Sequence, residues 1–190
     1  MDISYILPAI VILIVAFIVY TYNRLVGLRN TADTAYSNID TLLQKRFDLV
    51  PNLVETVKGY MQHEREVLET VTKARTDWLN ASTIQENAGA DETASRALKT
   101  LFAVSENYPE LKANQNFLLL QEELAGIENK IAYARQRYNR TIMVLNMVIQ
   151  RFPSNYVARL FNFKTREYFS AESDQVRSVP RVEVQGGDSR

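Results

Sequence analysis

The chain has 190 residues, with 22 basic and 22 acidic side chains, one histidine and no cysteine. The absence of cysteine excludes disulfide bonds, thiolate catalysis, and zinc-thiolate and iron–sulfur sites. A formal net charge of zero gives no overall attraction to polyanions, so we expect no nucleic-acid partner.

The first predicted element is an apolar helix over residues 3–23, a run without any charged side chain. As a helix it spans about 30 Å, which matches the hydrocarbon core of a bilayer. A cleaved signal would begin with basic residues and end in small ones, whereas this chain opens with Asp2. We therefore interpret residues 1–23 as an uncleaved, single-pass anchor in the lipid bilayer.

The charges that flank the anchor predict its orientation. Arg24 and Arg29 follow the run and no Lys or Arg precedes it. The positive-inside rule then places the rest of the chain in the cytoplasm, with an extracytoplasmic domain as the alternative.

Helical spacing continues beyond the anchor. Apolar residues from Leu25 to Leu42 recur at steps of three and four, so the span is predicted to continue as one helix. Arg46 would fall on this apolar stripe, which resumes in a shifted register from Val50 to Trp78. We therefore expect a kink or short break beside Pro51. Residues 81–92 lack periodicity and are predicted to form the loop that turns the chain back.

A second long helical stretch is predicted from about Asp91, interrupted at Tyr108–Pro109. It then carries a heptad seam, whose members are Phe117, Leu124, Ile131, Tyr138, Leu145 and Phe152, interleaved with Leu120, Ile127, Ala134, Thr141 and Val148. This pattern is more often the core of a bundle than an intermolecular coiled coil, which stays the alternative.

The end of the chain is predicted to hold a short helix and a tail. Ser154 follows Phe152-Pro153 and is expected to cap a helix to about Phe163. The predicted fold is all-α: an anchor over 1–23, an antiparallel bundle of three to four helices over 24–166, and an irregular tail over 167–190.

Catalytic side chains are scarce. His63 lies in a polar stretch of the first predicted helix and is expected to be solvated. A di-iron carboxylate site in a bundle needs two histidines, and the glycine motifs of nucleotide sites and the nucleophile elbow are missing. We expect no enzyme activity and no metal or other cofactor.

Charge is segregated along the second half of the chain. Residues 81–128 carry eight acidic and three basic side chains, whereas residues 129–166 carry eight basic and no acidic ones. Pairing within the fold or between copies is the preferred interpretation, and contact with lipid headgroups is the alternative. The candidate oligomer or lipid contacts are Arg135, Arg137, Arg140, Glu122, Glu123 and Glu128.

Several blocks resemble the LemA family of bacterial membrane proteins. They are YNRLVGLRNTADTAYSNIDTLLQKRFDLVPNLVETVKGY (residues 22–60), NYPELKANQNFLLLQEEL (107–124), IENKIAYARQRYNRTIMVLN (127–146) and the Phe152-Pro153 turn. The resemblance implies one N-terminal membrane helix, a helical domain without established enzymatic activity, and location in the bacterial inner membrane. The family also includes magnetosome-membrane proteins, and its members are often associated with membrane protein quality control by a metalloprotease of the HtpX type.

These observations predict a non-enzymatic, membrane-anchored scaffold that forms homo-oligomers and organises the membrane or partner proteins. A signalling module with a ligand between its helices is one alternative. An accessory hydrolase that uses glutamates of the stretch from His63 to Glu69 is another.

Overall fold

A computed structural model describes residues 3–170, and these form helices without strands. The helices are α1 (Ile3–Lys58), α2 (Arg65–Asn80), α3 (Ile84–Ser105), α4 (Pro109–Lys112), α5 (Gln115–Gln150) and α6 (Ser154–Leu160). The predicted all-α class, with one long N-terminal apolar helix, is confirmed.

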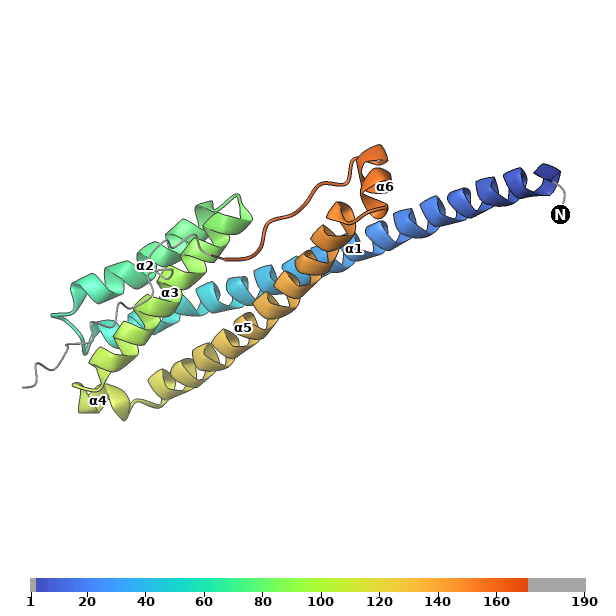
Figure 1. The fold of residues 1–190 in the computed structure, drawn as a ribbon. Coiled ribbons are helices and arrows are strands. Elements are labelled where there is room, and N and C mark those ends of the chain that lie inside the picture. Colours follow the sequence, from blue (N-terminus) through green and yellow to red (C-terminus); the bar gives the residue numbers. More distant parts are fainter. Residues whose placement is uncertain (1–2, 171–190) are drawn as a thin grey trace, which may run out of the picture.

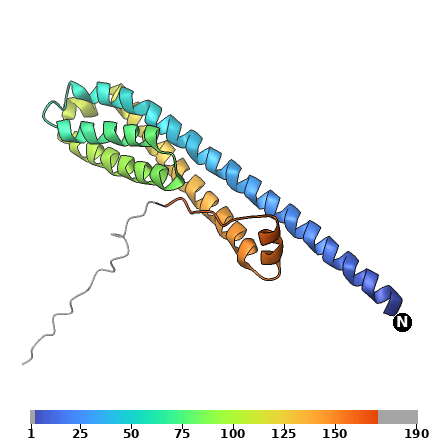
Figure 2. The same ribbon diagram turned by 90° about the horizontal axis from the view of Figure 1, so that it is seen from above.

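The helices form a bundle at one end of a long rod. α1 and α5 run antiparallel, and the α2–α3 hairpin packs at the end remote from the N-terminus (Figures 1 and 2). Residues of α1 to α5 share one large core there. Closer to the N-terminus, only α5 and α6 accompany α1, around a small cluster of Leu25, Leu145, Val148 and Ala158.

The first part of α1 stands clear of the other helices (Figure 1). Its large apolar side chains from Ile6 to Val19 are mostly exposed. Among the described residues, α1 is the one helix long and apolar enough to cross a membrane. Its exposure separates it from the buried core helix of a soluble protein and fits the predicted anchor.

The predicted break beside Pro51 is wrong, because α1 continues through it for 56 residues in all. Proline lacks an amide hydrogen, so the carbonyl of Phe47, four residues earlier, loses its helical donor. Arg75 of α2 replaces that donor, with its Nε 3.1 Å from the Phe47 oxygen. The apolar stripe is also unshifted: Leu43, Phe47 and Val50 are buried on one face, with Arg46 among them.

Removing the Arg75 donor should reveal the cost of the helical hydrogen bond that Pro51 cannot make to the Phe47 carbonyl. We expect Arg75→Leu to destabilise the full chain by about 1–3 kcal/mol, because the buried Phe47 carbonyl would lack a partner. Arg75→Leu combined with Pro51→Ala should recover much of this loss, since an alanine at position 51 supplies the amide hydrogen that restores the helical bond. Urea unfolding in mild detergent would measure both, and equal stability of the single and double variants would contradict the explanation.

The loop predicted over residues 81–92 is also wrong, because α3 begins at Ile84 and only three residues separate it from α2. A capping box starts the helix: Thr83 Oγ1 accepts from the Glu86 amide, and Glu86 Oε2 accepts from the amides of Thr83 and Ser82 at 2.9 and 2.6 Å. These donors lower the pKa of Glu86. Four of the nine buried residues of α3 are alanines, whose weak hydrophobicity explains the faint periodicity of this face.

Three further expectations, for Ser154, Phe152 and His63, need correction. Ser154 lies inside α6 instead of capping it, and that helix ends at Leu160. Phe152 is 74% exposed, so the buried seam of α5 ends before it. His63 is exposed as predicted but lies in the turn between α1 and α2.

Residues 161–170, here called the strap, run from α6 back along α5. Asn146 binds the Arg166 backbone through both amide atoms, at 2.8 and 2.9 Å. Asn139, two turns earlier, binds the Phe169 backbone in the same way, at 2.8 and 3.2 Å. The tail predicted from residue 167 therefore packs on the bundle as far as the buried Phe169; residues 171–190 lie outside the described part.

Candidate functional site: a buried ion-pair network

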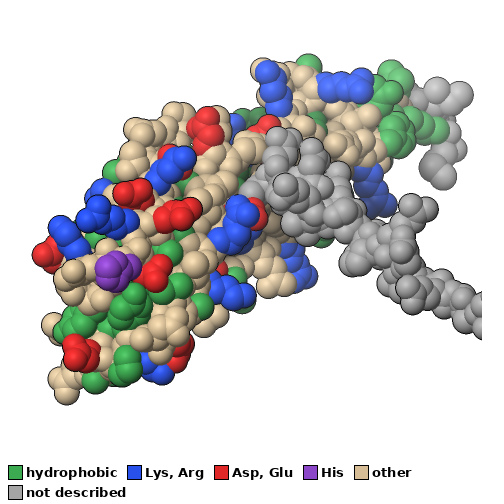
Figure 3. Space-filling view, turned by 90° about the vertical axis from the view of Figure 1, so that its left-hand side faces the viewer, with side chains coloured by type: hydrophobic (Ala, Val, Ile, Leu, Met, Phe, Trp, Pro, Cys, Tyr) green, Lys and Arg blue, Asp and Glu red, His purple; other side chains and the backbone are tan. Residues whose placement is uncertain are grey.

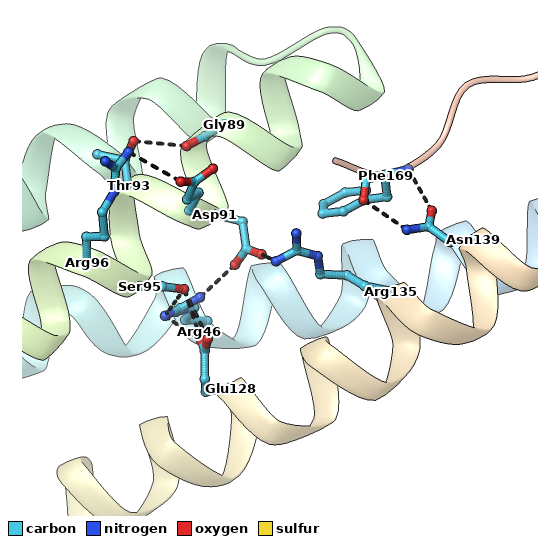
Figure 4. Close-up of polar contacts among 11 residues, drawn as sticks. Arg46, Gly89, Asp91, Thr93, Ser95, Arg96, Glu128, Arg135, Asn139 and Phe169 are labelled. Carbon is cyan, nitrogen blue, oxygen red and sulfur yellow. Dashed lines mark hydrogen bonds and ion pairs between the residues drawn. The ribbon is translucent and has the colours of Figure 1, made fainter. Parts of the chain in front are cut away.

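The most unusual feature of the core is a buried arginine on α1. Arg46 is 2% exposed, and its guanidinium lies 2.6 Å from Asp91 Oδ1 of α3 and 2.7 Å from Glu128 Oε2 of α5 (Figure 4). Its Nη2 also donates to Ser95 Oγ at 3.1 Å, while Nε is buried without a partner among the described residues. One side chain thus ties α1 to two other helices at one level.

Asp91 is the buried acid of this network and is 1% exposed. Its second oxygen lies 3.4 Å from Nη1 of Arg135, so the carboxylate is placed between two guanidinium groups. Burial raises the pKa of Asp91, and the two arginines oppose that rise. Small residues on the same face of α3, such as Ala88 and Ala94, are buried beside it.

The network reaches the surface through α5. Ser95 Oγ donates to Glu128, which is partly exposed. Arg135 is also partly exposed, and its guanidinium carbon lies 5.2 Å from the centre of the Phe169 ring of the strap (Figure 4). Through this contact the strap is coupled to the same charges that join α1, α3 and α5.

This arrangement is suited to fixing helix register. A buried charge has its counter-charges in one alignment only, and any shift of α1 by a turn would take Arg46 away from Asp91 and Glu128. Proton transfer would require access to the carboxylate, and Asp91 is enclosed. We interpret the network as structural.

The six predicted contact residues fall into two groups. Arg135 and Glu128 are in ion pairs within the chain, with Asp91 and Arg46 respectively. Arg137, Arg140, Glu122 and Glu123 are exposed on α5 and join none of the ion pairs of residues 3–170. The structure thus places Arg135 and Glu128 in the ion-pair network around Arg46 and Asp91, and it leaves the other four side chains exposed to solvent.

Sequence reasoning missed Arg46 and Asp91 as partners. The signal was present: an arginine on an otherwise apolar stripe indicates a buried counter-charge as readily as a broken helix. Asp91 on a face of alanines was the matching sign, 45 residues away.

Two of the open grooves on the described part of the chain differ in their charge. One, of about 910 Å³, lies between α1 and α2, where Glu55 and Glu69 alternate with Lys58, Arg65 and Lys73. The other, of about 640 Å³, lies between α1 and α5 and contains Lys45, Lys130 and Arg137 without an acid. Acidic and basic side chains are otherwise interspersed over the end of the bundle in Figure 3.

Across residues 3–170 no three His, Cys, Asp or Glu side chains are grouped to hold a metal ion.

This chain is similar over most of its length to several known proteins. The chain is 25% identical over 185 residues to Magnetosome protein MamQ 2 of Paramagnetospirillum magneticum, covering 84% of this chain and 68% of the relative. Magnetosome protein MamQ of Magnetospirillum gryphiswaldense is 26% identical over 188 residues, covering 84% and 69%. Protein LemA of Metamycoplasma hominis is 25% identical over 176 residues, covering 88% and 75%. The LemA family profile matches residues 35–184, most of the chain beyond the span, and the protein belongs to the LemA family.

Proposed function

We propose that this protein is a non-enzymatic, membrane-anchored scaffold that self-associates and organises membrane or partner proteins. The observation that carries the proposal is the continuity of α1, which is both the apolar span and a central helix of the bundle. A domain joined to its anchor by an unbroken helix is held at a defined height and orientation above the bilayer, as a scaffold requires.

Orientation and partners are part of the same proposal. Arg24 and Arg29 after the span favour a cytoplasmic domain in the bacterial inner membrane. A membrane metalloprotease of the HtpX type is the candidate partner from the family associations. The names of the MamQ relatives refer to magnetosomes, which is compatible with a role in organising a membrane.

Membrane anchoring restricts how copies can meet. Neighbours in one bilayer lie at equal height, but Arg137 and Glu123 are separated along α5 by about 20 Å. A pairing of Arg137 with Glu123 of a neighbour would need a large stagger. An acid at the right level is Asp40, because its neighbours Asn38 and Thr41 on α1 line one groove with Arg137. Asp40 is exposed and joins none of the ion pairs of the described residues.

Cross-linking in native membranes tests this proposal. We expect oligomers larger than a dimer, because cyclic or arrayed contacts suit rods with one orientation and tethering raises their effective concentration. Arg137→Glu with Arg140→Glu should reduce cross-linked species, with helix content unchanged, and raised salt should act in the same direction.

Two rescue variants identify the contact. Adding Asp40→Arg should restore assembly if copies meet at equal height, whereas adding Glu122→Lys and Glu123→Lys should do so if they are staggered. Lys73→Glu with Lys99→Glu, on exposed positions of α2 and α3, is the control for a change of the same charge. A strictly monomeric wild-type chain, in native membranes and in mild detergent alike, would contradict the scaffold proposal.

A further inference from the structure

The turn between α5 and α6 lies beside the last turns of the span. Phe152 and Pro153 line one hollow with Phe17, Tyr20 and Arg24 of α1. Figures 1 and 2 both place α6 next to α1 at this level. The ring of Tyr22 in α1 lies 4.7 Å from that of Phe161, at the end of α6.

This part of the chain, residues 151–161, here called the interfacial turn, exposes large apolar side chains. α6 buries Val157 and Ala158 against the rest of the molecule. The other face of α6 leaves Leu160 71% exposed, with Tyr156 also exposed, and Phe152, two residues before the helix, is 74% exposed. The rings of Phe152 and Tyr156 are 6.1 Å apart and so form one apolar patch, and Leu160 lies one helical turn after Tyr156. Such a patch in water is unfavourable and indicates a contact surface.

The charges around the interfacial turn all have one sign. Arg24, Arg29, Arg151, Arg159 and Lys164 are exposed and form what we call the basic collar. Residues 129–166 contain no acid, and the first acid after the span is Asp33. An apolar face flanked by exposed arginines and lysines is the pattern of segments that lie in the headgroup region of a bilayer.

The length of the span sets the depth. Residues 3–23 cover about 30 Å as a helix, close to the thickness of the hydrocarbon core. A bilayer that covers them also reaches Phe17 and Tyr20, and therefore the Phe152-Pro153 turn beside them. The occupant of the exposed patch is then the membrane that α1 already crosses.

The backbone of the turn is suited to this position, where exposed carbonyls are costly. Ser154 Oγ lies 2.6 Å from the Val148 carbonyl oxygen and 2.8 Å from that of Arg151, and its one proton is shared between them. The amides of Arg151 and Asn155 donate to Met147 and Arg151. The carbonyls of Met147, Val148 and Arg151 therefore have donors within the chain.

We propose that the interfacial turn is a second membrane contact: its apolar side chains enter the boundary between headgroups and acyl chains, and the basic collar binds anionic headgroups. The molecule is then held in the membrane by the apolar part of α1 and by a second contact beside it, so its rotation about the axis of α1 is restricted. This contact needs only one copy of the chain and goes beyond the scaffold proposal.

Because the chain has no cysteine, a cysteine introduced at one position can be labelled there alone. Phe152→Cys and Leu160→Cys variants of the full chain would carry the environment-sensitive NBD fluorophore in phosphatidylcholine vesicles, at fewer than one chain per vesicle. Tyr133→Cys, 70% exposed on α5 away from the span, is the aqueous control, and Leu13→Cys in the span is the lipid control. Iodide quenches from water, and lipids with a doxyl group near the headgroup quench from the bilayer.

At positions 152 and 160 we expect blue-shifted emission, several-fold weaker iodide quenching than at position 133, and clear doxyl quenching. Iodide quenching equal to that at position 133 would overturn the proposal. So would protection from iodide without doxyl quenching, because protein would then cover the patch. Phosphatidylglycerol should increase the blue shift, and Arg151→Gln with Arg159→Gln should remove that increase; equal shifts in neutral and anionic vesicles would overturn the headgroup contact.

Discussion

Replacing Arg46 with methionine is expected to destabilise the chain by about 3–5 kcal/mol, the cost of leaving a buried charge without its main partner. Asp91 would keep only Arg135, at 3.4 Å, and Ser95 would lose the guanidinium beside it. Urea unfolding of the full chain in mild detergent measures the loss. The single tryptophan, Trp78, reports on this region because it stacks on Phe47 with ring centres 4.9 Å apart.

Removing both charges should be far less harmful than removing one. In Arg46→Met with Asp91→Leu no uncompensated charge is buried, while Glu128 and Arg135 can be hydrated because both are partly exposed. The double variant should therefore recover most of the loss. Arg137→Met, at an exposed site of α5, is the control, and an equally small effect of Arg46→Met would refute the role of the network.

The loss in Arg46→Met should also depend on pH. Burial raises the pKa of Asp91, and Arg46 and Arg135 lower it. Without Arg46 the lowering contribution is smaller, so the pKa rises further above its value in the unfolded chain. The native state takes up more protons than the unfolded state as pH falls, so the variant should gain stability relative to wild type. If the loss of unfolding free energy in Arg46→Met stayed constant as the pH was lowered towards the usual carboxyl range, the interpretation that Asp91 is ionised would be contradicted.

The second large effect is expected on the apolar face of α5. Ile131→Ala and Leu124→Ala should each cost about 2–5 kcal/mol, through lost burial and the cavity that remains. Both side chains are buried in the main core. Gln136→Ala, exposed on the same helix, should change the unfolding free energy by less than about 0.5 kcal/mol.

Phe152→Ala adds a sharper control, because the heptad pattern assigns Phe152 to the seam while the fold exposes it. It should behave like Gln136→Ala in the unfolding experiment. Equal losses at positions 131 and 152 would mean that the register of α5 is wrong.

Periodic features were predictable from sequence, and individual partners were not. The span and the seam of α5 each repeat an apolar signal over many turns, so local patterns suffice to predict them. Arg46 is a single polar residue on such a stripe, and its meaning depends on Asp91, 45 positions away. The start of α3 was not predicted because the alanines on its buried face differ little in hydrophobicity from their neighbours. The capping pair Thr83 and Glu86 nonetheless indicated it.

The strap was missed for another reason. Asn139 and Asn146 bind backbone atoms of residues 166–169, and backbone atoms leave no sequence pattern. The spacing nonetheless matches: seven residues of helix cover about 10 Å, as do three residues of extended chain. Asparagines two turns apart on a helix are thus informative only once an extended segment is known to pass them.

With residues 3–23 in the bilayer, as we propose, the unbroken α1 transmits any change in the tilt of its apolar part to the far end of the bundle. From Asn23 to Lys58 the helix extends about 50 Å beyond the span. Transmembrane helices change their tilt when bilayer thickness changes, and a tilt of about 10° would move the far end sideways by roughly 9 Å. At Pro51, where α1 lacks one helical hydrogen bond, Arg75 of α2 supplies a donor to the free Phe47 carbonyl. A change in membrane thickness would in this way be converted into a lateral displacement of the bundle.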